Sequence, residues 1–126
     1  MVDALRSARV LKTSWFARAA RKAAITDDEL CRAVKQAQAG QCDDLGGGVY
    51  KKRVSRNLYR SIILAKGGRH WVLTYLFAKK DRANIDPAEL SALRELAKGY
   101  EKLTAAQLTE LFKAKELEEI CRDDQA

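Results

Sequence analysis

The fold is decided by residues 49–78, which read VYKKRVSRNLYRSIILAKGGRHWVLTYLFA. β-branched and aromatic residues fill three short runs in this stretch, and polar breaks separate the runs. A period of two is typical of β-strands, so we predict strands at residues 49–55, 58–65 and 71–78. The break KGGR at residues 66–69 predicts a tight hairpin turn, because glycine at its centre permits a positive φ. The three strands therefore form an antiparallel meander.

The third predicted strand is apolar on both of its faces. One face carries Trp71, Leu73, Tyr75 and Phe77, and the other carries Val72, Leu76 and Ala78. A strand of this kind is buried on both sides, so we expect it at the centre of the sheet. Residues 55–58 predict a tight turn between the first two strands.

Two short helices are predicted before the strands. Thr13 or Ser14 caps the first, whose apolar residues recur every three to four positions. The second begins with a capping box formed by Thr26 and Glu29. A short connection between them makes a helical hairpin. Ahead of this hairpin, residues 10–12 could form a short edge strand.

Helices are also predicted after the strands. Pro87 suits the first turn of a helix with a leucine stripe, and Thr104 caps another helix. Residues 116–120 form either a closing strand or a frayed helical end. The order of helices, meander and helices makes the fold class α+β. We expect one domain over residues 1–126, with loose ends at 1–11 and 122–126.

The composition suits one soluble core. Hydrophobic residues make up 47% of the 126 residues and charged residues 33%. No apolar run approaches the ~18 residues of a membrane-spanning helix, and the N-terminus has no signal-peptide pattern. We therefore expect a cytoplasmic protein with no membrane partner.

The three cysteines are predicted to be thiols without disulfide bonds. Cys31, Cys42 and Cys121 are odd in number and widely spaced, and no CxxC pair is present. This pattern favours neither a disulfide framework nor a zinc site. We expect buried or half-buried thiols, with Cys31 structural beside the apolar stripe of the second helix.

The charge is unevenly distributed along the chain. Residues 1–82 carry 18 Lys and Arg against 7 Asp and Glu, a net of +11. Residues 83–126 carry 6 against 10, a net of −4, which gives the total of +7. Within residues 49–82 ten basic residues face one acid, Asp81. Such an excess attracts polyanions, and because it lies on predicted strands, not on a basic amphipathic helix, it favours nucleic acid over a membrane.

The alternation of side chains along a strand determines which of these basic residues share a face of the sheet. Lys51 and Arg53 share one face of the first strand. If the turn at residues 55–58 is tight, Arg60 lies near Arg53. Three further cations follow the third strand and can reach the same end of the sheet: Lys79, Lys80 and Arg82. We expect three or four of these cations to converge on a concave surface, which by itself predicts phosphate binding without chemistry.

The chain resembles the RelE/HigB-like toxins of type II toxin–antitoxin systems. The resemblance is carried by WFAR at residues 15–18, LGGGV at 45–49, KKR at 51–53, YR at 59–60 and, above all, FAKKDRANI at 77–85. It extends from about residue 12 to residue 120. It implies a compact RelE-like α+β fold with a small antiparallel sheet. It also implies ribosome-dependent cleavage of mRNA, neutralised by a small antitoxin protein.

The resemblance further implies roles for individual residues. Lys51 looks like the general base and Arg53 like a charge stabiliser beside it. Arg60 matches the arginine that contacts the scissile phosphate, and Lys80 matches an acid or electrostatic stabiliser. Cleavage by the 2′-hydroxyl needs a base, a stabilised phosphorane and a protonated leaving group, and no metal or other cofactor. A lysine among cations has a lowered pKa, which suits it to act as a base.

Further RNA contacts are expected from the basic residues around these four, namely Lys52, Arg56, Lys66, Arg69, His70, Lys79 and Arg82. The expected partners are mRNA, ribosomal RNA and the antitoxin, with no small-molecule cofactor. His70 is expected at the surface or rim. Tyr50 and Tyr59 either stack on bases or pack in the core. Two alternatives stay open: a ParE-like toxin that inhibits DNA gyrase, and a basic RNA- or DNA-binding module without activity.

Overall fold

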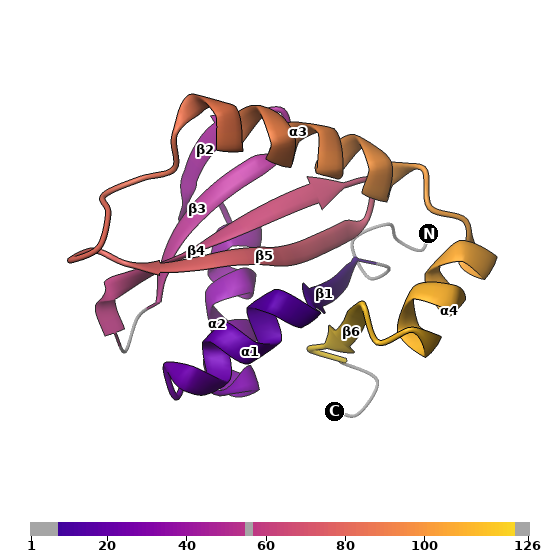
Figure 1. Cartoon of the computed structure of the whole chain (residues 1–126), viewed down its shortest axis with the longest axis horizontal. Helices are drawn as coiled ribbons and strands as arrows, with labels where there is room; N and C mark the ends of the chain where they lie inside the picture. The colour runs from indigo at the N-terminus through magenta and orange to yellow at the C-terminus, as the bar shows by residue number, and fades with distance from the viewer. Residues whose placement is uncertain (1–7, 55–56, 123–126) are drawn as a thin grey trace.

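One mixed β-sheet organises the chain (Figure 1). The computed structural model describes residues 8–54 and 57–122, the side chains of residues 57–59 excepted. The strands are β1 (Arg9–Thr13), β2 (Asp43–Gly46), β3 (Val49–Val54), β4 (Asn57–Gly67), β5 (His70–Ala78) and β6 (Leu117–Ile120). The helices are α1 (Ser14–Lys22), α2 (Asp27–Gln38), α3 (Pro87–Glu101) and α4 (Ala105–Lys113). The strand order is β2-β3-β4-β5-β1-β6, and the fold class is α+β as predicted.

The predicted meander is present as β3, β4 and β5, but the sheet is larger and not wholly antiparallel. β1 pairs in parallel with β5, and every other neighbouring pair is antiparallel. β5 is central, as its two apolar faces predict. Residues 9–11, expected in a loose end or at an edge, lie instead in β1 between two strands, where Leu11 is fully buried.

Helices cover both faces of the sheet. α2, with Phe16 of α1, packs on one face against Ile62 and Leu64, and we call this the α2 face. α3 packs on the other through Leu93, which contacts the cluster of Val49, Ile63 and Phe77, and we call this the α3 face. Figure 1 shows α3 along one side of the sheet and α1 and α2 along the other. Within the described residues no helix is long and apolar enough to cross a membrane.

The helix starts follow the predicted capping signals. The Thr13 hydroxyl accepts a hydrogen bond from the Phe16 amide at the start of α1. The Thr26–Glu29 capping box is present at α2, and Thr104 caps α4. Each interaction satisfies an amide that would otherwise lack a partner in the first turn. These local signals therefore set the helix boundaries.

Two glycine-containing turns of the sheet lie against α3. Gly46, Gly47 and Gly48 all have positive φ, from +65° to +88°, and connect β2 to β3. Arg94 of α3 donates to the carbonyls of Leu45 (2.6 Å) and Gly46 (3.2 Å). Asp43 and Asp44 belong to β2, which this turn pairs with β3.

The hairpin between β4 and β5 is one residue later than predicted. Gly67 pairs with His70, so the central residues of the turn are Gly68 and Arg69, and Gly68 has a φ of +57°. Gly67 stays in the strand because α3 approaches it closely. A Cβ there would collide with the backbone carbonyl of Ala97.

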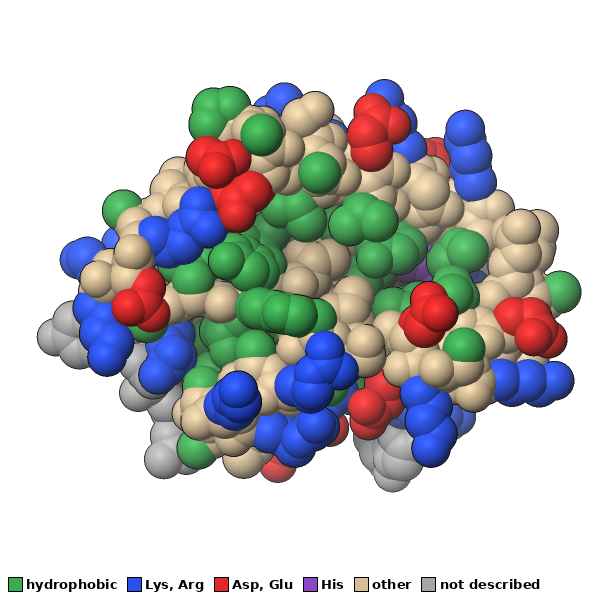
Figure 2. Space-filling view, viewed as in Figure 1, with side chains coloured by type: hydrophobic (Ala, Val, Ile, Leu, Met, Phe, Trp, Pro, Cys, Tyr) green, Lys and Arg blue, Asp and Glu red, His purple; other side chains and the backbone are tan. Residues whose placement is uncertain are grey.

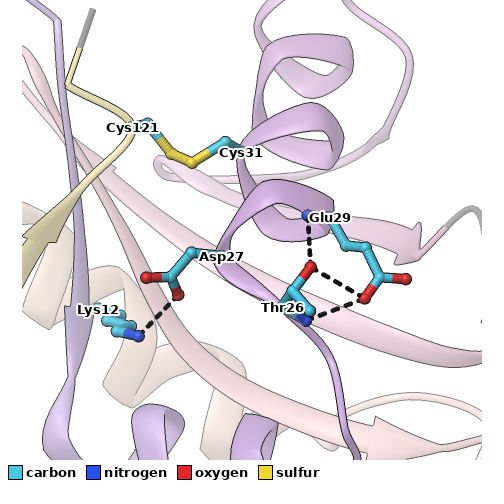
Figure 3. Close-up of a disulfide and its surroundings, with 6 residues drawn as sticks. All are labelled: Lys12, Thr26, Asp27, Glu29, Cys31 and Cys121. Carbon is cyan, nitrogen blue, oxygen red and sulfur yellow. Dashed lines mark hydrogen bonds and ion pairs between the residues drawn. A yellow bond between two sulfur atoms is a disulfide. The ribbon is translucent and has the colours of Figure 1, made fainter. Parts of the chain in front are cut away.

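A disulfide joins Cys31 of α2 to Cys121, just after β6 (Figure 3). The prediction of thiols is therefore wrong for these two residues, whereas Cys42 is a half-buried thiol as expected. The pairing of β6 with β1 brings the end of β6 to α2, so the two cysteines meet although they are 90 residues apart. Beside the disulfide, the buried Lys12 donates to Asp27 at 2.8 Å.

Candidate nucleic-acid interface

Lys51 and Arg53 lie on the α3 face of β3. The sheet register pairs Lys51 with Ile63 and Arg53 with Ser61. Val49 packs in the cluster under α3, whereas Tyr50 and Val54 pack under α2, so the predicted alternation of this strand is confirmed. Arg53 is exposed. The side chain of Lys51 is only 17% exposed, so the surrounding protein limits its motion.

Lys51 forms an ion pair with an acidic residue. Its ammonium lies 3.9 Å from a carboxylate oxygen of Asp43, on the neighbouring strand β2. Asp43 is 69% exposed, so water screens this pair and the attraction is weak. The sequence predicted only cations near Lys51, and the structure adds the carboxylate of Asp43. An incoming phosphate can compete with Asp43 for the ammonium group.

Arg60 lies on the other face from Lys51 and Arg53. It pairs with Ala78 and is two residues from Ile62, which packs under α2. The sequence-based expectation that Arg60 joins Arg53 is therefore not met.

The register between β3 and β4 gives the reason. Val54 pairs with Asn57, and in an unbroken hairpin this register would set Arg60 opposite Lys51. Arg53 pairs instead with Ser61, so three extra residues of β4 intervene. A shift by an odd number of residues moves each side chain that follows to the opposite face. The predicted turn itself includes residues 55 and 56, and with Arg56 it lies outside the described residues.

Lys79 and Lys80 lie at the same end of the sheet as Arg53. Arg53, Ser61 and Phe77 form one row across β3, β4 and β5, and Lys79 follows two residues after Phe77. Both lysines are exposed. The row and the turn after it therefore present Arg53, Lys79 and Lys80 at one end of the sheet, and Lys51 lies two residues before Arg53 on the same face. We call this group the basic edge: Lys51, Arg53, Lys79 and Lys80.

Arg82, expected to contact RNA, is held by the protein itself. Its guanidinium makes two hydrogen bonds with Glu89, at 2.9 and 2.5 Å, and a third with the Tyr75 hydroxyl at 3.3 Å. It also donates to the Asn84 carbonyl and lies 5.9 Å from the Phe77 ring centre. The hydrogen bonds from Arg82 lower the pKa of Glu89. Arg82 therefore fastens the turn that carries the basic edge to the first turn of α3.

The remaining predicted RNA contacts do not lie at the basic edge. Lys66, Arg69 and His70 lie at the hairpin between β4 and β5, and seven residues of β4 separate Gly67 from Arg60. At ~3.3 Å per residue this distance is about 23 Å. Lys66 donates to the Gly68 carbonyl and lies over Trp71.

His70 and Lys52 also differ from their expected places. His70 is 7% exposed, and its Nδ1 donates a hydrogen bond to the Tyr100 carbonyl at 3.1 Å. The prediction of a surface or rim position is therefore wrong. Its burial lowers the pKa of the imidazole. Lys52 alternates onto the α2 face with Tyr50, where it is half-buried. Neither residue extends the basic edge.

Two acids that were not among the predicted site residues shape this region, Asp43 and Glu89. The partnership of Asp43 with Lys51 depends on the pairing of β2 with β3. Glu89 was recognisable from sequence as the third residue of a capping box that starts at Asp86. Its second role, as the partner of Arg82, depends on how the turn after β5 folds back on α3.

A family model described as the RelE toxin of the RelE/RelB toxin–antitoxin system matches residues 8–120. No curated protein and no solved structure matches the chain. The matched span includes every strand and helix of the structure and the whole basic edge.

Proposed function

This chain belongs to the RelE toxin family of RelE/RelB toxin–antitoxin systems, and from that premise we propose that it cleaves mRNA on the ribosome. The family implies a cognate RelB antitoxin as its protein partner. The observation that carries the proposal is the basic edge, where Arg53 of β3 lies at the same end of the sheet as Lys79 and Lys80, and Lys51 lies two residues before Arg53 on the same face. Cations gathered at one edge suit the phosphates of a single RNA strand.

The proposed reaction is a transesterification within the RNA. Lys51, once it has released its own proton to water and become a neutral amine, accepts the proton of the 2′-hydroxyl, whose oxygen attacks the adjacent phosphorus. The bond from phosphorus to the 5′-oxygen breaks, and that oxygen takes up a proton from the Lys80 ammonium or from water. Arg53 and Lys80 stabilise the additional negative charge of the phosphorane. Arginine suits this role because it stays protonated throughout.

Arg60 receives a different role from the one implied by the family resemblance. It lies at the same end of the sheet but on the α2 face, so Arg60 and Arg53 lie on opposite faces of the sheet. We assign Arg60 to holding a flanking phosphate. Loss of its side chain is then expected to raise KM more than it lowers kcat, because the contact is equally strong in the ground state and the transition state.

Cleavage of a translated message by purified protein and ribosomes tests the proposal. A positioned general base contributes about 10²–10⁴-fold to the rate, so Lys51→Ala is expected to lose activity by that factor. The matched control is Lys98→Ala on α3, whose side chain is 69% exposed, and it is expected to cleave normally. Equal losses in the two variants would refute the assignment of Lys51.

Expression and binding experiments with the same protein distinguish the proposed function from its two alternatives. Growth arrest with intact mRNA and inhibited DNA gyrase would favour a ParE-like toxin and overturn the proposal. Binding of RNA with neither cleavage nor growth arrest would favour a basic binding module. In both assays the cleavage products distinguish the proposed reaction, because attack by the 2′-hydroxyl leaves a cyclic phosphate on one fragment.

A further inference from the structure

A pocket opens beside the disulfide, between α2 and the end of β6. Its volume is about 830 Å³, which falls within the roughly 300–1,000 Å³ of small-molecule sites. Among the described residues, it shares no lining residue with the apolar groove between α1 and α3, where Figure 2 shows hydrophobic side chains gathered in a hollow. None of the proposed catalytic residues lines the pocket, so it is separate from the basic edge.

Both cysteines of the disulfide line this pocket. Cys31 comes from α2 and Cys121 directly follows β6, and each is partly exposed. Apolar side chains of Val10, Val34 and Ile120 also line it. Access to the sulfur atoms is one of the factors that set the rate of thiol–disulfide exchange. A small thiol in the pocket can therefore reach the disulfide while the protein stays folded.

Two of the acids that line the pocket form ion pairs within the protein. Asp27 accepts a hydrogen bond from the buried Lys12 at 2.8 Å, and Figure 3 shows this pair beside the disulfide. Glu119 accepts two hydrogen bonds from Arg9, at 2.7 and 2.9 Å. The Lys12 ammonium also lies 4.0 Å from a carboxylate oxygen of the exposed Glu118. These ion pairs offset most of the negative charge around the pocket.

The remaining charged residues of the pocket are mainly basic. Arg32 and Lys35 are exposed on α2, and Arg122 follows Cys121. Asp28 is the one further acid among the described residues that line the pocket. Cations beside a disulfide attract an anionic reagent and stabilise the thiolate of the cysteine that leaves. The charge of the pocket therefore favours a small thiol that carries a net negative charge.

The backbone around the disulfide suits a bond that opens and closes. Cys121 has a φ of +63°, a left-handed conformation that is uncommon for residues other than glycine, so opening the bond lets this residue relax. The pairing of β6 with β1, and the hydrogen bond from Lys12 of β1 to Asp27 of α2, connect the same segments without the disulfide. We expect these contacts to keep the Cα atoms of the two cysteines, which are 5.4 Å apart, within range for the bond to form again.

We propose that the disulfide between Cys31 and Cys121 is a site of thiol–disulfide exchange, and that its reagent is a small anionic thiol of the glutathione class that enters this pocket. The inference goes beyond the proposed function and does not depend on it, because it needs neither RNA nor ribosomes.

The exchange takes place in two steps and consumes two molecules of the small thiol. The thiolate of the first attacks one cysteine sulfur, so a bond forms between these two atoms while the bond between the cysteines breaks. The cysteine that leaves takes up a proton from water. The thiolate of the second molecule then attacks the small-thiol sulfur of this mixed disulfide, and the other cysteine leaves and is protonated. The small thiol ends as its own disulfide, and the protein gains two thiols.

Reduction of the folded full chain by two small thiols of opposite charge tests the proposal. The probes are the anionic mercaptoethanesulfonate and the cationic cysteamine, and Cys42→Ser is present throughout so that counted thiols come from the disulfide alone. Each rate is divided by the rate of the same thiol with the neutral hydroxyethyl disulfide, which removes differences in intrinsic reactivity. At low salt the anionic thiol is expected to have a normalised rate at least fivefold higher, and high salt is expected to remove the difference.

Charge reversal at the pocket tests whether its cations cause this preference. Arg32→Glu with Lys35→Glu is expected to make the cationic thiol the faster reagent. The matched control, Arg18→Glu with Lys22→Glu, reverses two exposed residues of α1 and changes the net charge by the same amount. It is expected to keep the preference for the anionic thiol, because neither residue lines the pocket.

A destabilised core distinguishes attack on the folded protein from attack on the unfolded chain. Ile63 is fully buried under α3 and does not line the pocket. If the thiol enters the pocket of the folded protein, Ile63→Ala is expected to change the rate of reduction by less than about twofold. The rate is also expected to rise in proportion to the thiol concentration, which is measured on the unsubstituted core as well.

Several results would overturn the inference. These are equal normalised rates for the two thiols, a preference that charge reversal at Arg32 and Lys35 leaves unchanged, an acceleration of at least tenfold by Ile63→Ala, and a rate that reaches a plateau as the thiol concentration rises. The last two would mean that the disulfide reacts only after the protein unfolds. A failure of RNA cleavage would refute the proposed enzyme but would leave each of these rates unchanged.

Discussion

Breaking the bond between Cys31 and Cys121 is expected to lower the free energy of unfolding by about 4.6 kcal/mol. The two residues are 90 apart in sequence, so the bond closes a large loop in the unfolded chain. The loop-closure relation gives about 2.1 + 1.5R ln 90, or roughly 15.5 cal/mol/K, which is about 4.6 kcal/mol at 25 °C. Domains of this size are stable by only about 5–15 kcal/mol, so the bond contributes a large share.

Urea unfolding followed by circular dichroism measures this effect. The oxidised protein is compared with the protein reduced by a phosphine, and with a variant in which Cys31 and Cys121 are both serine. An unfolding entropy of about 2.1 cal/mol/K per residue over 126 residues converts the loss into a fall in Tm of about 17 °C. Cys42→Ser, with the bond intact, is the control and is expected to leave the midpoint within a few degrees.

Counting thiols by alkylation under denaturing conditions verifies the state of each sample. One reactive thiol is expected in the oxidised protein and three after reduction. Equal midpoints for samples with one and three thiols would refute the argument, because they would mean that the closed loop does not restrict the unfolded chain.

Three further predictions concern the core, pH and the approach of α3. Ile63→Ala is expected to cost about 2–5 kcal/mol, because this side chain is fully buried under α3; a loss below 1 kcal/mol in urea unfolding would contradict it. Burial lowers the pKa of His70, so its contribution to stability is complete above about pH 6.5 and is lost as the pH falls through the folded-state pKa. His70→Gln should therefore flatten the change in urea midpoint between pH 7 and pH 5, and an unchanged slope would count against this account. Gly67→Ala is expected to destabilise the protein by more than 1 kcal/mol through collision with the Ala97 carbonyl, whereas Gly99→Ala, where a Cβ meets nothing, should be neutral or stabilising.

Local signals in the sequence predicted most of the helices and strands. The capping box of Thr26 and Glu29 sets the start of α2, and Thr104 sets the start of α4. Each acts within one turn of helix, so nothing distant is needed to recognise it. The two apolar faces of β5 likewise predicted its central place in the sheet. Even Lys51 and Arg53 follow this rule, since alternation along one strand fixed their shared face.

Pairings between segments far apart in the chain could not be predicted from the sequence. The position of β1 depends on a parallel partner some 60 residues later, and the disulfide depends in turn on β6 beside β1. The face of Arg60 was mispredicted because a three-residue irregularity in β4 changes the register, and composition carries no trace of it. The cations predicted to form one cluster therefore lie in two places: some form the basic edge, and Arg60 lies on the opposite face of the sheet.

The sequence alone determined the class of fold and the excess of positive charge, because periodicity, caps and composition are properties of neighbouring residues. The family was indicated by the resemblance of short motifs, which are also local. The tertiary structure alone decided which cations share a face, that Arg82 is paired with Glu89, and where an apolar groove opens between α1 and α3. These features arise where segments far apart in the chain come into contact. Their geometry depends on strand register and helix packing, which a change of one residue can alter completely.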